Sequence, residues 1–253
     1  MRESKLFGVG VSLGTREELL REALALLDTG GTIATVNASM LEYARTHSAF
    51  REVLEGMSLR LPDGHGVSRA FSRRGEETDT LPGVELGLLL LTSRAYLRVA
   101  LYGGKAGVAK RARDAILALS PTTDILYVRD GYHYTPFEVA RDLAKVQVDL
   151  VFVCLGSPRQ ERVAKMLSEI LPSALIVGLG GSFDVWCGDT PRAPVMWQKN
   201  GMEWLWRILK EPKRISKVPT LVSFSYHLFK EELQQNSQKA KKKHETKENN
   251  QQI

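Results

Sequence analysis

Residues 149–158 read DLVFVCLGSP, a run that is apolar at nearly every position and then turns at glycine and proline. Its β-branched and aromatic side chains favour a strand that is buried on both faces. Similar runs occur elsewhere in the same half of the chain: LRVALYGG (97–104), DILYVRDG (124–131) and ALIVGLGG (174–181). Stretches with helical spacing separate these runs. The alternation predicts an α/β fold in which helices flank a parallel sheet.

Most of these runs end in glycine, which permits a tight turn and lets backbone N–H groups approach a ligand closely. Ligands of parallel α/β sheets lie beyond the carboxyl ends of the strands. Helix N-termini open at the same edge and favour phosphate groups. We therefore expect a phosphate-bearing ligand there. GVGVSLG (8–14) and GLGGSFD (178–184) each miss one glycine of the dinucleotide fingerprint, which argues against a nicotinamide enzyme.

The bulk composition is that of a globular protein with an anionic partner. The chain has 253 residues, 43% apolar and 25% charged, with a formal charge of +6. Cys154 and Cys187 stand alone among apolar residues and are interpreted as reduced core cysteines. The N-terminus is too broken by glycine for a signal peptide, and no apolar run reaches about 18 residues. We expect a cytoplasmic protein with peripheral membrane contact.

Two polar motifs follow predicted strands in the N-terminal part. LPDGHG (61–66) places Asp63 between a strand and a helix, where it is either a turn residue or a general base. TVNAS (35–39) carries polar side chains at alternate positions, which face one side if the segment is extended. These side chains either bind sugar hydroxyls or, through Ser39, cap the helix that starts at Met40.

A third motif, GSPRQE (156–161), follows the central strand. Gln160 can both donate hydrogen bonds to a sugar and accept them, and Arg159 can pair with phosphate. The alternative is ordinary helix capping by Ser157 and Glu161.

The strand–helix rhythm stops after Asp189. Three of the four tryptophans lie there among lysines and arginines. This pattern predicts a basic amphipathic helical appendage over residues 195–234, after an α/β core over residues 1–194. A docking helix with a solvated face is the alternative, and single-stranded nucleic acid is a weaker one. Residues 235–253 are rich in charge and amides, which predicts a disordered tail.

Taken in order along about residues 6–217, these blocks resemble the WecG/TagA/CpsF glycosyltransferases. The matching segments are TVNAS, LPDGHGV, LYGG, DGYH, GSPRQE, GLGGSFDVWCG and RAPVMWQKNGMEWLWRILKEPKR. The resemblance implies a Rossmann-like core and a membrane-binding appendage. It also implies inverting, metal-independent transfer of an N-acetylmannosamine-type sugar from a UDP donor to a polyprenyl-pyrophosphate-linked GlcNAc acceptor. Such reactions build cell-wall and surface polysaccharides on the cytoplasmic membrane face.

The resemblance also implies roles for single residues. The proposed base is Asp63, and the other active-site residues are Thr35, Asn37 and Gln160. We expect the donor to lie against the glycine-rich strand ends, with Asp184 at the ribose or uracil. The substrate-binding set there is Gly103, Gly104, Gly131, Tyr132, Gly156, Arg159, Gly180 and Asp184. The basic residues implied to hold the lipid pyrophosphate are Arg207, Arg214 and Lys217.

We expect the appendage to bring these cations over the active site only at the membrane. Its anchors would be the tryptophans together with Leu221, Val222 and Phe229. No nucleic-acid partner is expected, and a homo-oligomer is left open.

The sequence departs from the family pattern at two positions. Thr80 stands where an arginine is frequent, so either Arg73 or Arg74 supplies the missing cation or a substrate differs. Lys217 replaces an arginine and loses its bidentate geometry. The alternatives are therefore a transferase of the same fold with a UDP-glucose or UDP-N-acetylmannosaminuronic acid donor, and a non-catalytic protein that binds nucleotide sugars or lipid pyrophosphates.

Overall fold

The computed structural model describes the backbone of residues 1–251 and the side chains of residues 1–234 other than Lys199, Lys213 and Arg214. Its main sheet has six parallel strands in the order β4-β3-β8-β7-β5-β6, and β1 and β2 form a separate antiparallel hairpin. The strands are β1 Arg2–Leu6, β2 Val9–Leu13, β3 Gly31–Val36, β4 Leu59–Pro62, β5 Arg98–Gly103, β6 Asp124–Arg129, β7 Leu150–Cys154 and β8 Leu175–Gly178. The prediction of an α/β fold with a parallel sheet is confirmed. The hairpin was not predicted from the sequence.

Helices connect the strands and continue beyond the sheet. In the core they are α1 Arg16–Thr29, α2 Ala38–Thr46, α3 Ser48–Glu55, α4 His65–Ser72, α5 Gly83–Ser93, α6 Val108–Leu119, α7 Pro136–Leu143, α8 Arg159–Ile170 and α9 Ser182–Trp186. The C-terminal helices are α10 Val195–Lys199, α11 Glu203–Lys210, the 3₁₀ helix η1 Pro212–Lys217 and α12 Val218–Gln251. A capping box formed by Thr15 and Glu18 starts α1.

The sheet is buried on both faces because successive strand residues point to opposite sides. In β7, Val151 and Val153 pack into one apolar cluster, with residues of α2, α3, α7 and α8. Leu150 and Phe152 pack into the other cluster, with residues of α1, α5 and α6. This alternation explains why residues 149–158 read as continuously apolar.

Gly103 ends β5 at a place where no side chain fits. Its φ is 135°, and a Cβ there would lie 2.3 Å from the carbonyl oxygen of Cys154. We predict that Gly103→Ala lowers the free energy of unfolding in urea by about 2–4 kcal/mol. Gly75 is the matched control, with φ 77° and nothing within 4 Å of its Cβ position. Gly75→Ala should cost about 1 kcal/mol, because it introduces backbone strain alone. Equal losses in the two variants would contradict the clash.

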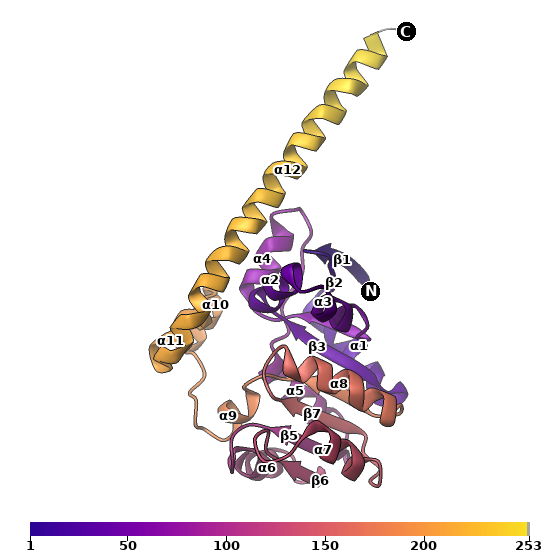
Figure 1. Cartoon of the computed structure of the whole chain (residues 1–253), viewed down its shortest axis with the longest axis vertical. Helices are drawn as coiled ribbons and strands as arrows, with labels where there is room; N and C mark the ends of the chain where they lie inside the picture. The colour runs from indigo at the N-terminus through magenta and orange to yellow at the C-terminus, as the bar shows by residue number, and fades with distance from the viewer. Residues whose placement is uncertain (252–253) are drawn as a thin grey trace.

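The C-terminal helices form an arm beside the core, and α12 runs along α2 and then extends past it (Figure 1). Among the described residues, no helix is both long enough and apolar enough to cross a membrane. The helical backbone continues to Gln251, where the sequence predicted disorder from residue 235. Lysine, glutamate and glutamine, which are frequent in this stretch, are good helix formers. The side chains beyond residue 234 lie outside those described, and the domain boundaries stay predictions.

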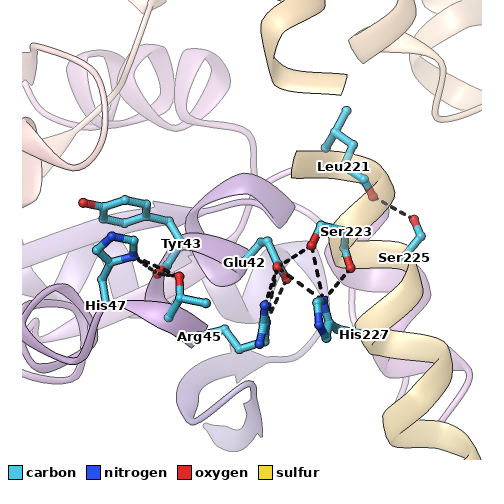
Figure 2. Close-up of polar contacts among 9 residues, drawn as sticks. Glu42, Tyr43, Arg45, His47, Leu221, Ser223, Ser225 and His227 are labelled. Carbon is cyan, nitrogen blue, oxygen red and sulfur yellow. Dashed lines mark hydrogen bonds and ion pairs between the residues drawn. The ribbon is translucent and has the colours of Figure 1, made fainter. Parts of the chain in front are cut away.

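A buried carboxylate fastens α12 to α2 (Figure 2). Glu42 of α2 is 6% exposed and accepts hydrogen bonds from Arg45 (2.9 Å) and from the Ser223 hydroxyl of α12 (2.7 Å). His227 Nδ1 lies 3.3 Å from the same carboxylate. Burial alone would raise the pKa of Glu42, but the hydrogen bonds from Arg45 and Ser223 outweigh it and lower the pKa.

Apolar contacts support this junction. Phe224 and Leu228 of α12 are buried in the core, and the Phe224 ring packs edge-on against Phe7 with centroids 5.5 Å apart. The first turns of α12 are thus part of the folded core, which fixes where η1 and α11 lie.

Candidate functional site

A pocket of about 570 Å³ opens at the carboxyl ends of the parallel strands. Its walls come from the segments that follow β3, β4, β5, β7 and β8, and the C-terminal arm closes one side with Arg207, Lys217 and Thr220. The location is the one expected for a ligand of a parallel α/β sheet.

Asp63 lies in this pocket directly after β4. Its backbone N–H donates to the carbonyl oxygen of Val36 over 2.8 Å, which extends the pairing of β4 with β3 by one residue. Gly64 follows with φ 87°, so the chain turns sharply into α4. Asp63 is therefore a turn residue, as one interpretation held, and it also lines the pocket.

The surroundings of Asp63 favour its neutral form. Burial raises the pKa of Asp63 to about 7, although the guanidinium groups of Arg207 and Arg192 act to lower it. The carboxylate of Glu203 raises this pKa further. A carboxyl group with a pKa near neutrality can accept a proton in a reaction at physiological pH. Strong desolvation in a pocket is also a general mark of functional carboxylates.

The TVNAS segment lines the pocket with Thr35, Asn37 and Ser39, but it is not extended throughout. Thr35 is in β3, whereas α2 already begins at Ala38. The helix cap is Asn37, whose side-chain oxygen accepts from the backbone N–H of Met40 over 3.2 Å. The expectation that Ser39 caps this helix is therefore wrong, because the helix begins two residues earlier than predicted.

Gln160 and Arg159 of the GSPRQE segment form hydrogen bonds within the protein. Gln160 lines the pocket yet is 3% exposed, and its amide is hydrogen-bonded to Gly180 and Glu161. Arg159 donates to the carbonyl oxygen of Gly131 over 3.0 Å. The alternative of capping by Ser157 is not what the structure shows, since Pro158 occupies the N-cap of α8 and no side chain caps that helix.

Most of the predicted donor-binding residues gather at the pocket. Its lining includes Gly104, Gly131, Tyr132, Gly156, Arg159, Gly180 and Asp184. Gly103 is not among the lining residues, because its place is set by the close approach to β7 described above. Burial raises the pKa of Asp184, and the nearby ammonium group of Lys105 acts against it.

Two of the three predicted pyrophosphate-binding cations, Arg207 and Lys217, line the pocket from the C-terminal arm. The side chain of Arg214 lies outside the described residues. The sequence-based expectation brought these cations over the site only at a membrane, whereas Arg207 and Lys217 line the pocket in the chain alone, with the arm joined to the core at Glu42. Of the three tryptophans, Trp204 is 48% exposed, whereas Trp197 and Trp206 pack together with ring centroids 5.6 Å apart.

Arg73 and Arg74 do not replace the cation missing at Thr80. They pair with Glu232 and Glu231 of α12 over 3.6 and 2.7 Å. Near Thr80, two other arginines converge on Glu85 of α5: Arg16 at 2.5 Å and Arg192 at hydrogen-bonding distance. Arg192 also acts on Asp63, so it is the cation on this side of the site.

Sequence reasoning missed Lys105, Arg192 and Glu203. Lys105 lines the pocket and directly follows the glycine pair of β5, so its position in LYGGK was a usable signal. Glu203 acts on the pKa of Asp63 from the C-terminal arm, and Arg192 acts on it from the segment before the arm. Their contacts arise only from folding. Among the described side chains, His, Cys, Asp and Glu nowhere gather in threes as they would around a metal ion.

Comparison with known proteins gives two findings. The model of the glycosyl transferase WecG/TagA/CpsF family matches residues 4–238. A protein of Bacillus subtilis (strain 168), N-acetylglucosaminyldiphosphoundecaprenol N-acetyl-beta-D-mannosaminyltransferase, is 32% identical over 206 residues, which cover 80% of each chain.

Proposed function

The chain belongs to the WecG/TagA/CpsF family of glycosyltransferases, and we propose that it transfers an N-acetylmannosamine-type sugar from a UDP donor to a polyprenyl-pyrophosphate-linked GlcNAc acceptor. In this proposal the transfer proceeds with inversion and without a metal ion. The product would enter the synthesis of teichoic acid or another polymer of the cell wall.

The observation that carries the proposal is the pocket carboxylate Asp63 in a chain similar to an N-acetylmannosaminyltransferase. The printed name of that relative states a lipid-diphosphate acceptor that carries N-acetylglucosamine. A pyrophosphate-bearing acceptor suits the cations Arg207 and Lys217, which line the same pocket as Asp63.

The proposed reaction is a single displacement. Asp63 takes the proton of the attacking acceptor hydroxyl, whose oxygen forms a bond to the anomeric carbon of the donor sugar. The bond between that carbon and the UDP oxygen breaks on the opposite face, which inverts the configuration. UDP leaves with the bonding electron pair, and the proton remains on Asp63.

The departing diphosphate needs positive charge, which the chain offers without a metal ion. Lys105 lines the pocket. The N-terminus of α8 also lines it, with Ser157, Pro158 and Arg159. A helix N-terminus carries a partial positive charge that favours phosphate oxygens. We propose that these groups stabilise UDP as it leaves.

We propose that the C-terminal arm lies on the inner face of the cell membrane. Its α12 presents a stripe of exposed apolar side chains at helical spacing: Val222 (63% exposed), Tyr226 (61%), Phe229 (56%) and Leu233 (52%). Ile215 of η1 and Leu209 of α11 are also exposed, at 66% and 61%. An apolar stripe with cations beside the pocket favours an anionic lipid surface over water.

The proposal is tested by measuring UDP release from UDP-N-acetylmannosamine, UDP-glucose and UDP-N-acetylmannosaminuronic acid in EDTA. Each donor is offered with and without a short-chain prenyl-pyrophosphate-GlcNAc acceptor. We expect acceptor-dependent release from UDP-N-acetylmannosamine. Release from another donor alone would replace the sugar in the proposal, and a requirement for added divalent cation would overturn metal independence.

The pKa of Asp63 predicts the pH dependence of transfer. Because the base must be deprotonated, kcat/KM should rise about tenfold per pH unit below pH 7 and level off above it. Two substitutions in α11 should move this limb in opposite directions. Arg207→Gln removes a charge that lowers the pKa of Asp63, so the limb should move to higher pH. Glu203→Gln removes a charge that raises the pKa of Asp63, so the limb should move to lower pH.

The measurement is kcat/KM between pH 5 and 9 for the three proteins, compared by the position of the limb and not by its height. This separates the effect on Asp63 from lost contacts to the acceptor. A limb that stays in place in both variants would mean that another group is the base.

A further inference from the structure

We propose that Thr35, Gln160 and Glu161 are positioning residues: together they form a buried brace that fixes the turn after β8 (residues 178–181), against which the donor diphosphate binds. The inference rests on the proposed function, since it takes the ligand of this turn to be UDP. It differs from the sequence-based expectation, which gave Thr35 and Gln160 catalytic roles.

Thr35 holds the start of the turn from β3. Its hydroxyl donates to the carbonyl oxygen of Gly178 over 3.1 Å, and the side chain is 4% exposed. Gly83 packs over the same hydroxyl, so closely that a Cβ on it would lie 3.1 Å from the Thr35 oxygen. The Thr35 hydroxyl proton is thus committed to the backbone beneath the pocket surface.

Gln160 holds the middle of the turn from α8. Its side-chain oxygen accepts from the backbone N–H of Gly180 over 2.9 Å. The contact requires close approach, since a Cβ on Gly178 would lie 3.0 Å from the Gln160 nitrogen. Gly180 has φ 60°, a left-handed backbone conformation that favours glycine in a tight turn.

Glu161 fixes which way the Gln160 amide faces. The Gln160 nitrogen donates to the Glu161 carboxylate over 2.9 Å, so the amide oxygen is left to face Gly180. Glu161 is 0% exposed, and burial raises the pKa of its carboxyl group. Glu161 does not line the pocket itself, so it acts on the turn through its hydrogen bond with Gln160.

Binding and kinetic measurements can therefore distinguish a positioning role of these residues from a catalytic one. A residue that touches the reacting atoms changes kcat, whereas a residue that shapes the donor subsite changes the affinity for UDP. We expect Thr35→Val and Gln160→Met, which keep the side-chain volume, each to raise the Kd for UDP about tenfold. At saturating donor, kcat should fall by less than about threefold. Combined, the two substitutions should be less than additive, because both release the same turn.

Glu161 has a conservative variant that separates its role from general stability. Glu161→Gln keeps an oxygen that can accept from Gln160, so the Kd for UDP should stay within about threefold of wild type. Glu161→Met removes the acceptor and should match Gln160→Met.

The matched control is Thr32→Val. Thr32 lies in the same strand as Thr35, is 5% exposed, and uses its hydroxyl to accept from the backbone N–H of Ser58 over 3.0 Å at the far end of β3. It should lose stability as Thr35→Val does, yet bind UDP like wild type. Thermal unfolding of every variant is measured alongside.

The experiment is isothermal titration calorimetry with UDP, followed by kcat at saturating donor. Higher Kd values with nearly unchanged kcat support the brace. Unchanged Kd values with kcat reduced about a hundredfold would overturn it and return Thr35 and Gln160 to the reacting atoms. A wild-type chain that binds no UDP would overturn the proposed function and this inference with it.

Discussion

Asp63→Asn should reduce kcat for sugar transfer about a thousandfold, because it removes the only acid–base group of the side chain while keeping its size. Among the described residues, Asp63 combines a place in the pocket with a pKa near 7. The measurement is acceptor-dependent UDP release at pH 8, where wild-type Asp63 is mostly ionised. UDP binding should be unchanged, since the carboxylate serves the acceptor.

A second pocket carboxylate provides the control. Asp184 lines the same pocket at the start of α9 and is expected at the ribose or uracil of the donor. Asp184→Asn should therefore raise the KM for the donor with a smaller effect on kcat. If Asp63→Asn kept full turnover, or if both variants lost kcat alike, the assignment of the base would fail.

Asp63→Asn should also stabilise the fold at high pH. A carboxyl group whose folded pKa is raised gives its full stabilisation below its unfolded pKa and loses it as the pH rises through the folded value. For Asp63 this window runs from about pH 4 to about pH 7. The Tm of Asp63→Asn should thus exceed that of wild type at pH 8, and the gap should shrink toward pH 4.

Replacing Tyr226 and Phe229 together by serine should weaken binding to anionic liposomes about a hundredfold, because each exposed side chain loses its transfer into the interface. Transfer to a long-chain prenyl acceptor in liposomes should fall in parallel. Transfer to a short, water-soluble acceptor should be unchanged, since neither residue lines the pocket. Liposome flotation and the two assays give the readouts.

Leu119→Ser is the matched control for that pair. Leu119 is 53% exposed and ends α6, at the edge of the sheet opposite the pocket. Removing it takes away an exposed apolar side chain from another surface, so liposome binding should not change. If the control weakened binding as much as the pair, or if neither did, the arm would not be the membrane contact.

The sheet could be predicted from the sequence because strands buried on both faces leave continuous apolar runs. Residues 149–158 and 97–104 contain the adjacent strands β7 and β5; β5 matches its run to within one residue at each end, and β7 occupies the apolar first part of its run. The β1–β2 hairpin was missed, since β1 is mostly charged and exposed and the apolar run of β2 is short and interrupted by glycine and serine.

The pocket residues could be predicted where they directly follow strands. Asp63, Gly104 and Gly156 all lie at carboxyl ends, and the topology of a parallel sheet brings such positions together. The helix boundary at Asn37 was misplaced because Asn37 and Ser39, two positions apart, both suit a cap. The hydrogen bonds of Gln160 and the charges around Asp63 depend on contacts between distant segments, which no local pattern reveals.

The position of the C-terminal arm against the core could not be predicted from the sequence. Sequence patterns give an amphipathic helix, but they do not show that Glu42 of α2 binds Ser223 of α12. That contact joins α12 to α2 in a structure in which Arg207 and Lys217 line the pocket.

The mass of the lipid product tests most simply whether this chain adds one N-acetylmannosamine to a lipid-linked GlcNAc, as we propose. The purified chain is incubated with UDP-N-acetylmannosamine and prenyl-pyrophosphate-GlcNAc, and the lipid is analysed by mass spectrometry and NMR. The account predicts a product heavier by one N-acetylhexosamine residue, with the configuration at the transferred anomeric carbon inverted relative to the donor. An acceptor of unchanged mass, or a product with retained configuration, would contradict it.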